Sequence, residues 1–308
     1  MKNYYRIMLG KKSMYFEDAY KGNYVAAGFI QNENLTHHLS DNWRDFNKEF
    51  IPIFLKQNPD KTKISAGLAC GMLWTITKGI QIGDIVVCPD SKGNYYIGEV
   101  TGGYEYHQGQ IFPHRRPVRW FPITIPKENL SDPLKHSVGS IGTVSDISKY
   151  FDEIETLISG NRPASIIATD NSIEDPSVFA LEEHLEEFLV KNWASTEIGK
   201  KYDIYEEDGE VVGEQYPSDT GPMDILAISK DKKELLVVEL KRGRASDIVV
   251  GQIQRYMGYV KEELAEKNQI THGIIIAFED DINIHRALAV APNIDLYTYK
   301  VSFKLEKR

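Results

Sequence analysis

The stretch 223–241 constrains the fold of this chain more than any other, because it places acidic side chains inside apolar strands. It reads as two β-strands joined by a turn at 230–233. A symmetric loop at that turn opposes Asp224 with Glu239. Opposed side chains of an antiparallel pair have Cβ atoms about 4.5–5.5 Å apart, where two carboxylates repel each other unless a cation lies between them. The chain must therefore fold so that a positive charge reaches this pair.

Lys241 adds a third charged side chain at the same edge of the hairpin. It follows Glu239 by two residues, so both side chains point to one face of the strand. Mg²⁺ prefers oxygen ligands, and cleavage of a phosphodiester needs an activated water and a counter-charge for the phosphate. Asp224 and Glu239 are suited to bind the metal, and Lys241 to orient or deprotonate the water. An exposed hairpin with an ion pair is the alternative, but the apolar run 235–238 argues against exposure.

The spacing of these residues resembles that of the PD-(D/E)xK nuclease superfamily. Gly221-Pro222-Met223-Asp224 is followed, after 14 intervening residues, by Glu239-Leu240-Lys241. Met223 departs from the literal motif but leaves the acid in place. The resemblance implies a restriction-endonuclease-like α/β core, built from a helix, this hairpin and a flanking helix and strand. It also implies a Mg²⁺-dependent endodeoxyribonuclease in which Mn²⁺ can substitute.

A second motif lies in the helix that we predict over 246–266. Gln252 and Tyr256 are four residues apart, so their side chains share one helix face. The run 252–256 is similar to the Gln-x-x-x-Tyr motif of the RecB-like and Mrr-like branches of the superfamily. The similarity implies that Gln252 and Tyr256 belong to the catalytic site.

The helix predicted over 177–192 supplies a candidate third metal ligand. Its apolar stripe consists of Val178, Leu181, Leu185, Phe188 and Leu189. Among the glutamates of this helix, Glu182 lies nearest the stripe and is expected to point inward. Its spacing resembles that of the helix acid that completes the metal site in related nucleases. A glutamate that only borders the stripe is the alternative.

Residues 177–308 are predicted to form an α/β domain, because helices and strands alternate along this half. The expected strands are 223–229, 234–241, 273–278 and 294–303, and the expected helices are 177–192, 246–266 and 281–290. Glycine, proline and asparagine interrupt the pattern over 151–176, which we interpret as a linker.

Residues 1–150 are predicted to form a separate, β-rich α+β domain. A helix over 40–57, with Ser40 or Asp41 as its N-cap, carries the aromatic stripe Trp43, Phe46, Phe50 and Phe54. A second helix is expected over 62–78, with Trp74 in the core. The expected strands are 85–87, 95–100 and 117–125.

The charge of the chain is divided unevenly between these halves. Residues 1–150 carry a formal net charge of +4 and residues 151–308 one of −13, which gives −9 for the chain. A basic half suits a polyanion, although ordinary surface variation explains the difference equally well. No apolar run approaches the roughly 20 residues of a membrane helix, and the start has no apolar signal core, so we expect a cytoplasmic protein without a membrane partner. Cys70 and Cys88 lack the spacing of a zinc site and are expected to be buried thiols.

The first half is similar to PUA-like modules, in particular the EVE-like and Mrr-associated domains that precede nucleases in bacterial restriction systems. The similarity rests on Gly28-Phe29, Gly83-Asp84-Ile85-Val86, Gly98-Glu99-Val100 and Arg116-Pro117-Val118-Arg119-Trp120. It implies a pocket that holds a flipped, modified base. The residues suited to stacking are Phe29, Tyr104, Tyr106 and Trp120, and those suited to phosphate contacts are His114, Arg115, Arg116 and Arg119. Each aromatic can instead belong to the core.

These features predict a modification-dependent restriction endonuclease with a role in anti-phage defence. Its predicted partner is DNA that carries modified bases. The sequence does not decide whether the chain forms a homodimer. A repair nuclease selective for mismatches or branched DNA is one alternative, and a catalytically silent nucleic-acid-binding protein is another. The presence of Asp224, Glu239, Lys241 and Gln252 together argues against the silent protein.

Overall fold

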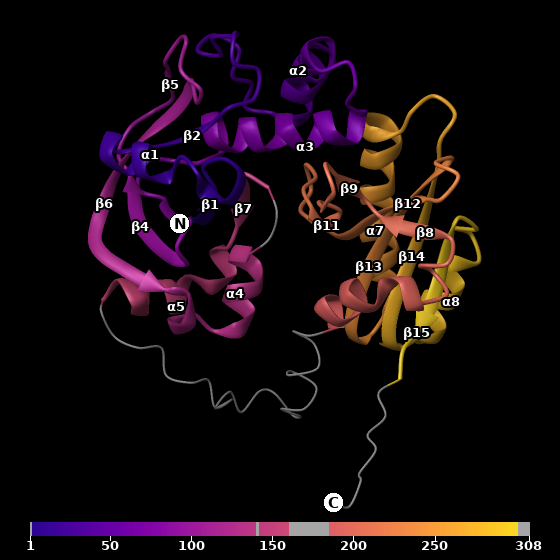
Figure 1. Cartoon of the computed structure of the whole chain (residues 1–308). Helices are drawn as coiled ribbons and strands as arrows, with labels where there is room; N and C mark the ends of the chain where they lie inside the picture. Colours follow the sequence, from indigo (N-terminus) through magenta and orange to yellow (C-terminus); the bar gives the residue numbers. More distant parts are fainter. Residues whose placement is uncertain (1, 140–141, 160–184, 301–308) are drawn as a thin grey trace, which may run out of the picture. The chain divides into compact units, whose positions relative to one another are not determined.

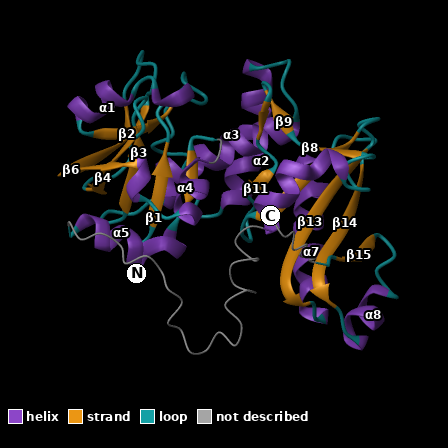
Figure 2. Ribbon diagram, turned by 60° about the horizontal axis from the view of Figure 1, so that its bottom comes forward, coloured by secondary structure: helices purple, strands orange, loops and turns teal. Residues whose placement is uncertain are grey.

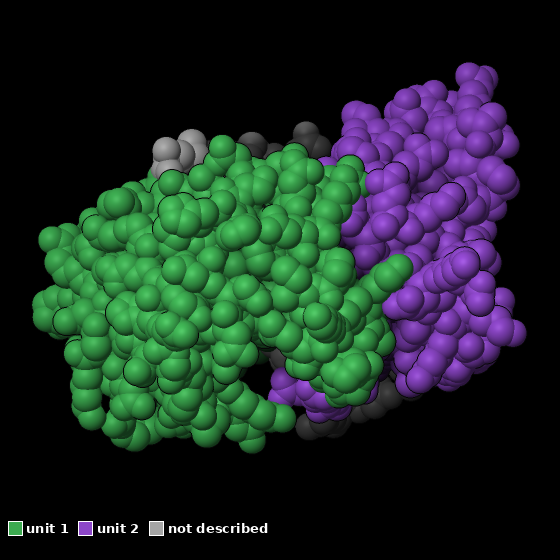
Figure 3. Space-filling model, turned by 90° about the horizontal axis from the view of Figure 1, so that it is seen from above, with its two compact units in different colours: residues 1–170 green, residues 171–308 purple. Residues whose placement is uncertain are grey.

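The chain folds into two compact units, residues 1–170 and 171–308 (Figure 3). The computed structural model describes residues 2–139, 142–159 and 185–300. The first unit is a β-rich α+β domain and the second an α/β domain, as the sequence predicts (Figure 1). Within the described parts of the chain, no helix is both long enough and apolar enough to cross a membrane.

The first unit is built on one sheet, which has seven strands among the described residues. Their order is β2-β6-β4-β3-β1-β7, with β5 paired to β6, and β1 and β3 are the parallel pair. The strands are β1 (Tyr4–Ile7), β2 (Tyr24–Ala27), β3 (Ile85–Pro89), β4 (Asn94–Val100), β5 (Glu105–Tyr106), β6 (His114–Pro126) and β7 (Val144–Asp146). Figure 1 shows β6 as a long curved strand. It begins before the strand that we predict at 117–125 and contains it.

Helices cover both faces of this sheet. They are α1 (Phe16–Gly22), α2 (Trp43–Gln57), α3 (Lys63–Trp74, continued as a π-helix to Gly79), α4 (Asp132–Gly139) and α5 (Phe151–Ile158). Ile85 and Val87 of β3 pack in a core with α4 and α5, whereas Val86 and Cys88 pack in a core with α1, α2 and α3. Burial on both faces explains why this strand reads as a continuous apolar run. Cys88 and Cys70 are buried free thiols, as predicted.

The N-cap of helix α2 lies one residue after Asp41 and two residues after Ser40, the two predicted caps. Asn42 is the N-cap, because its side chain accepts hydrogen bonds from the backbone N–H groups of Arg44 and Asp45. Asp41, one of the two predicted caps, forms an ion pair with Lys78 instead. The other, Ser40, accepts a hydrogen bond from the N–H of Asn42.

Helix α5 shows that the linker predicted over 151–176 starts too early. Residues 151–158 are helical, and Ile154 and Leu157 lie in the core of the first unit. Their spacing of three residues places both side chains on the buried face of a helix. The rest of the predicted linker, apart from Ser159, lies outside the described residues.

The second unit contains a sheet with the strand order β11-β12-β13-β14-β15, in which β8 also pairs with β12. Its strands are β8 (Tyr202–Ile204), β11 (Glu214–Tyr216), β12 (Met223–Ser229), β13 (Glu234–Arg244), β14 (Ile270–Glu279) and β15 (Ile294–Thr298). β12 and β13 are antiparallel, and β13, β14 and β15 are parallel and lie side by side (Figure 2). A small separate hairpin is formed by β9 (Glu206–Glu207) and β10 (Glu210–Val211).

Two helical segments pack on this sheet. Helix α7 (Asp247–Tyr259, continued as a π-helix to Leu264) contacts β13 and β14, and Gly273 of β14 permits the close approach. A Cβ atom at Gly273 would lie 2.6 Å from the sulfur of Met257. Residues 185–192 are also helical, and Leu189 packs against a core that contains Val238. Helix α8 (Ile282–Leu288) follows β14, as predicted.

Candidate active site

The hairpin β12–β13 has the register that the sequence predicts. Ile225 pairs with Val238, and this pair is the last regular one at this end. The next residues in the same register are Asp224 and Glu239. Oδ2 of Asp224 accepts a hydrogen bond from the backbone N–H of Leu240 at 2.7 Å. The carboxylate of Asp224 therefore reaches across to β13, where the regular ladder has ended.

Glu239 is the buried charged residue of this site. Only 3% of it is exposed. Its Oε1 accepts a hydrogen bond from Nζ of Lys241 at 2.8 Å, while its Oε2 is buried and has no hydrogen-bond partner among the described residues. Burial, and then the negative charge of Asp224, raise the pKa of Glu239, and Lys241 only partly offsets this rise. A second positive charge at Oε2 would stabilise the ionised carboxylate.

Helix α7 holds Lys241 in place. Nζ of Lys241 donates to Oε1 of Gln252 at 3.1 Å as well as to Glu239. Nε2 of Gln252 lies 3.4 Å from the hydroxyl of Tyr256, to which it donates from one helical turn away. The structure thus brings both predicted motifs together.

Glu186 and Gln215 also reach this site, and our sequence reasoning missed both. Nε2 of Gln215 donates to Oε1 of Glu186 at 2.7 Å and to Oδ1 of Asp224 at 3.3 Å. Glu182, the predicted third metal ligand, lies outside the described residues. Glu186 follows it by four residues in the helix that we predict over 177–192. At 100° per residue Glu186 lies farther from the apolar stripe than Glu182, so the stripe gives no signal for Glu186.

The described residues alone do not supply a complete set of ligands for a metal ion. Asp224 and Glu239 offer carboxylate oxygens, but no group of three His, Cys, Asp or Glu residues that could hold a metal occurs within the described ranges. The buried, unpartnered oxygen of Glu239 nevertheless fits a cation. Mg²⁺ is often held by one or two carboxylates, with water and substrate phosphate at the other positions.

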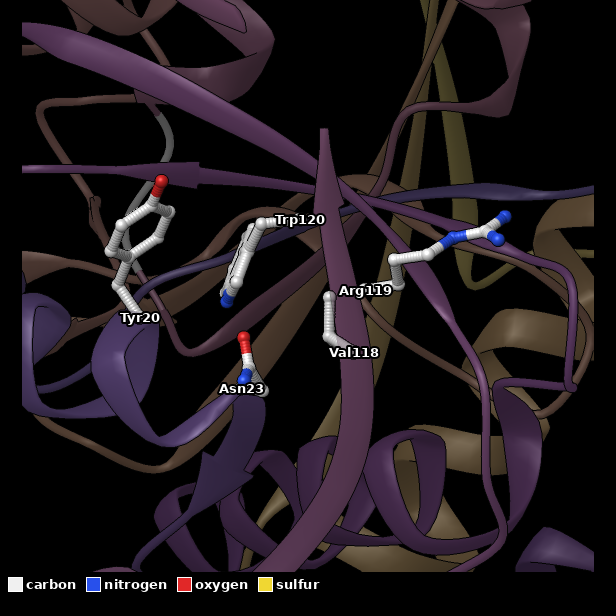
Figure 4. Close-up of a pocket in the computed structure, with 5 residues that line it drawn as sticks. All are labelled: Tyr20, Asn23, Val118, Arg119 and Trp120. Atoms are coloured by element: carbon white, nitrogen blue, oxygen red, sulfur yellow. The ribbon is translucent and has the colours of Figure 1, made fainter. Parts of the chain in front are cut away.

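The first unit carries a pocket of about 420 Å³ beside β6. Its lining consists of Tyr20, Asn23, Val118, Arg119 and Trp120 (Figure 4). The rings of Tyr20 and Trp120 have centroids 5.5 Å apart at an interplanar angle of 41°, so they form one aromatic wall and not two sides of a slot. Nε1 of Trp120 is buried without a hydrogen-bond partner among the described residues. Two predicted nucleic-acid residues, Arg119 and Trp120, therefore lie at this pocket.

The other aromatic residues predicted to bind DNA do not line the pocket beside β6. The hydroxyl of Tyr104 is hydrogen-bonded to Nδ1 of His114 at 2.9 Å, and the hydroxyl of Tyr106 donates to the carbonyl of Gln31. Phe29 packs against the core of the first unit. Burial lowers the pKa of His114, which is fully buried. The prediction that His114 contacts phosphate is therefore wrong.

All three predicted arginines have partners in the first unit, and the exposed Arg119 forms an ion pair with Glu99 at 2.8 Å. Arg116 is buried, and its guanidinium donates to the carbonyls of Gly102 and Ile80 at 3.0 and 2.6 Å. The prediction that Arg116 contacts phosphate is wrong, because these carbonyls enclose its charge. The guanidinium of Arg115 lies over the ring of Tyr24, 3.9 Å from its centroid.

Two family models match this chain. Residues 5–148 match a domain of unknown function (DUF8426), and residues 181–295 match the endonuclease NucS C-terminal domain. The second match includes Asp224, Glu239 and Lys241. The second unit is therefore similar to a nuclease domain, as the sequence predicts. The similarity of the first half to PUA-like and EVE-like modules, and the Mrr-like branch, stay predictions.

Solved structures of endonucleases match at low identity. A repair endonuclease from Pyrococcus abyssi is 16% identical, with 69% of this chain and 66% of that one covered and a TM-score of 0.31. An EndoMS–dsDNA complex is 14% identical, with coverages of 70% and 68% and a TM-score of 0.33. This chain spans slightly less than two thirds of the first of these proteins. No curated protein matches it at a significant level.

Proposed function

We propose that this chain is a metal-dependent DNA endonuclease of the PD-(D/E)xK type, with its active site at the end of hairpin β12–β13. One observation carries the proposal: Glu239 is buried opposite Asp224, and its Oε2 has no partner among the described residues. A buried charge of this kind destabilises the fold unless it is used. The match of residues 181–295 to an endonuclease domain supports the proposal.

In this proposal Asp224 and Glu239 hold Mg²⁺, and Mn²⁺ can replace it because it accepts the same oxygen ligands. Glu182 is proposed as a further ligand. The bound metal supplies a Lewis acid for the phosphate and lowers the pKa of a water. Lys241, fixed by Glu239 and Gln252, orients the attacking water and stabilises negative charge that develops on the phosphate.

Gln252→Ala is expected to slow cleavage about tenfold and to leave metal affinity within about twofold, because residues that orient an active group contribute at this scale. The substitution removes one of the two partners of the Lys241 ammonium group and touches neither carboxylate. Single-turnover rates and metal titrations would measure the two effects. Gln254→Ala is the matched control, since Gln254 lies on the same helix but is exposed. Equal rates for the two variants would show that Gln252 does not position the lysine.

We also propose that the first unit selects the DNA. Residues 1–150, which make up most of this unit, carry a net charge of +4, whereas residues 151–308 carry −13, and a polyanion binds a basic surface more readily. A base extruded from a duplex needs an aromatic face and polar groups at its edge. Trp120 offers a face, and the exposed side chain of Asn23 offers polar groups. Selection of a modified base by fit in this pocket would make the protein a restriction enzyme in anti-phage defence.

A repair nuclease is the second candidate. Mismatched and damaged bases are also extruded at low cost, so the same pocket suits them. The match to an endonuclease domain is compatible with both roles.

A substrate panel tests the function and separates the candidates. The full chain is incubated with Mg²⁺ or Mn²⁺ and with unmodified, methylated, hydroxymethylated, glucosylated, mismatched and branched duplexes. We expect products that disappear with a chelator, and faster cleavage of a modified duplex. Preferential cleavage of mismatched or branched DNA would replace restriction with repair. Binding to DNA without cleavage of any substrate would leave the catalytically silent protein.

A further inference from the structure

Gln215 has an unusual backbone conformation beside the candidate site. Its φ is +50°, in the left-handed region that residues with a Cβ atom rarely adopt. Strand β11 pairs Glu214 with Ile225 and Tyr216 with Met223, so Gln215 lies opposite Asp224. A conformation of this kind is sterically unfavourable for a residue with a Cβ atom and persists only where its surroundings impose it.

The side chain of Gln215 joins two carboxylates from separate elements. Its amide nitrogen lies 2.7 Å from Oε1 of Glu186 and 3.3 Å from Oδ1 of Asp224, so these two oxygens are within 6.0 Å of each other. An amide group has two N–H donors and can serve both acids at once. Because Oδ2 of Asp224 accepts the N–H of Leu240, both oxygens of this carboxylate have a hydrogen-bond donor.

We propose that Gln215 is a positioning residue of the metal site: its amide fixes the orientation of Asp224 and holds Glu186 beside it, so that both acids are ready for a cation. This inference rests on the proposed function and deepens it. Without the amide, the negative charges of the two acids repel each other, and Asp224 loses one of the hydrogen bonds that fix its orientation. Substitution of a residue that is hydrogen-bonded to a metal ligand commonly lowers metal affinity by 10–100-fold.

The backbone alone does not account for glutamine here. Glycine adopts a φ of +50° without the steric penalty and would form the same turn at lower cost. The amide is the group that glycine lacks. A glycine variant therefore separates the two roles, because it preserves the backbone conformation and removes the hydrogen bonds.

Gln215→Gly is expected to keep or raise the melting temperature and to weaken Mn²⁺ binding about tenfold, measured by calorimetry on the full chain without DNA. Cleavage at low metal concentration should fall by a similar factor and recover at high concentration. Gln215→Met keeps the length of the side chain without its donors and should show the same loss of affinity. Asp208→Gly is the control, because Asp208 has a φ of +53° outside this site; its metal affinity and cleavage should not change.

Unchanged Mn²⁺ affinity in Gln215→Gly would overturn the inference. So would a loss in Gln215→Gly that Gln215→Met does not share, because the effect would then come from the backbone. If the glycine variant does not fold, Gln215→Met decides alone. Failure of the proposed function looks different: the unsubstituted chain would then bind no Mn²⁺ and cleave no DNA at any metal concentration.

Discussion

Glu239→Gln is expected to reduce DNA cleavage by about 10³-fold or more, while the protein stays folded. The substitution preserves the size of the side chain and the hydrogen bond from Lys241, but it removes the negative charge that a cation needs. Asp224→Ala and Lys241→Ala should cause losses of the same order, because both residues belong to the same proposed site. Initial rates on one duplex, at saturating Mg²⁺, measure these losses.

The same variant should be more stable than the unsubstituted protein when metal is removed by a chelator. Burial raises the pKa of Glu239, which means that the folded protein disfavours its ionised form. The neutral amide of glutamine does not carry this cost. Each 1 kcal/mol regained raises the melting temperature by roughly 2–4 °C in a protein of this size. A gain in stability together with a loss of cleavage is typical of a functional charge and not of a structural one.

Glu234→Gln is the matched control. Glu234 begins the same strand, and it accepts a hydrogen bond from Tyr202 outside the site. Its substitution should leave cleavage unchanged. Equal cleavage rates for the Glu239→Gln and Glu234→Gln proteins would show that Glu239 does not belong to the active site.

The site in the second unit was largely predictable because strand periodicity is simple. A four-residue turn fixes the register of a hairpin, and a period of two then fixes which side chains share a face. This reasoning correctly placed Asp224, Glu239 and Lys241. It could not find Gln215, because a left-handed residue inside a strand follows from tertiary packing and leaves no pattern in the sequence.

The DNA-contacting residues of the first unit were predicted less well, because they were chosen by residue type and not by which side chains of a strand point to the same face. Along β6, His114, Arg116 and Val118 are buried, whereas Arg115 is half-buried and Arg119 is exposed. The period of two would have separated the structural Arg116 from the accessible Arg119. Tyr20 and Asn23, which complete the pocket, come from a helix and the turn after it, far from β6 in the sequence. Only the fold brings them together.

Trp120→Ala is expected to remove most of the preference for the favoured DNA. Stacking contributes about 1–3 kcal/mol for each base, which corresponds to about 5- to 150-fold in affinity. Binding of the full chain to the favoured and the unmodified duplex is compared in the Glu239→Gln background, where cleavage does not interfere. The ratio of the two dissociation constants should fall toward one, because unmodified DNA is bound mainly through phosphate contacts that Trp120 does not make.

Two further variants decide whether the pocket itself is responsible. Trp120 also packs against Phe16, so its removal alone could act through stability. Asn23→Gly avoids this problem, because Asn23 has a φ of +54° that glycine adopts freely, and only the polar group at the pocket is lost. It should lower the preference without lowering the melting temperature. Tyr106→Ala removes an aromatic ring outside the pocket and should leave the preference intact. If Tyr106→Ala abolishes the preference while Trp120→Ala and Asn23→Gly retain it, the base is bound elsewhere in the first unit.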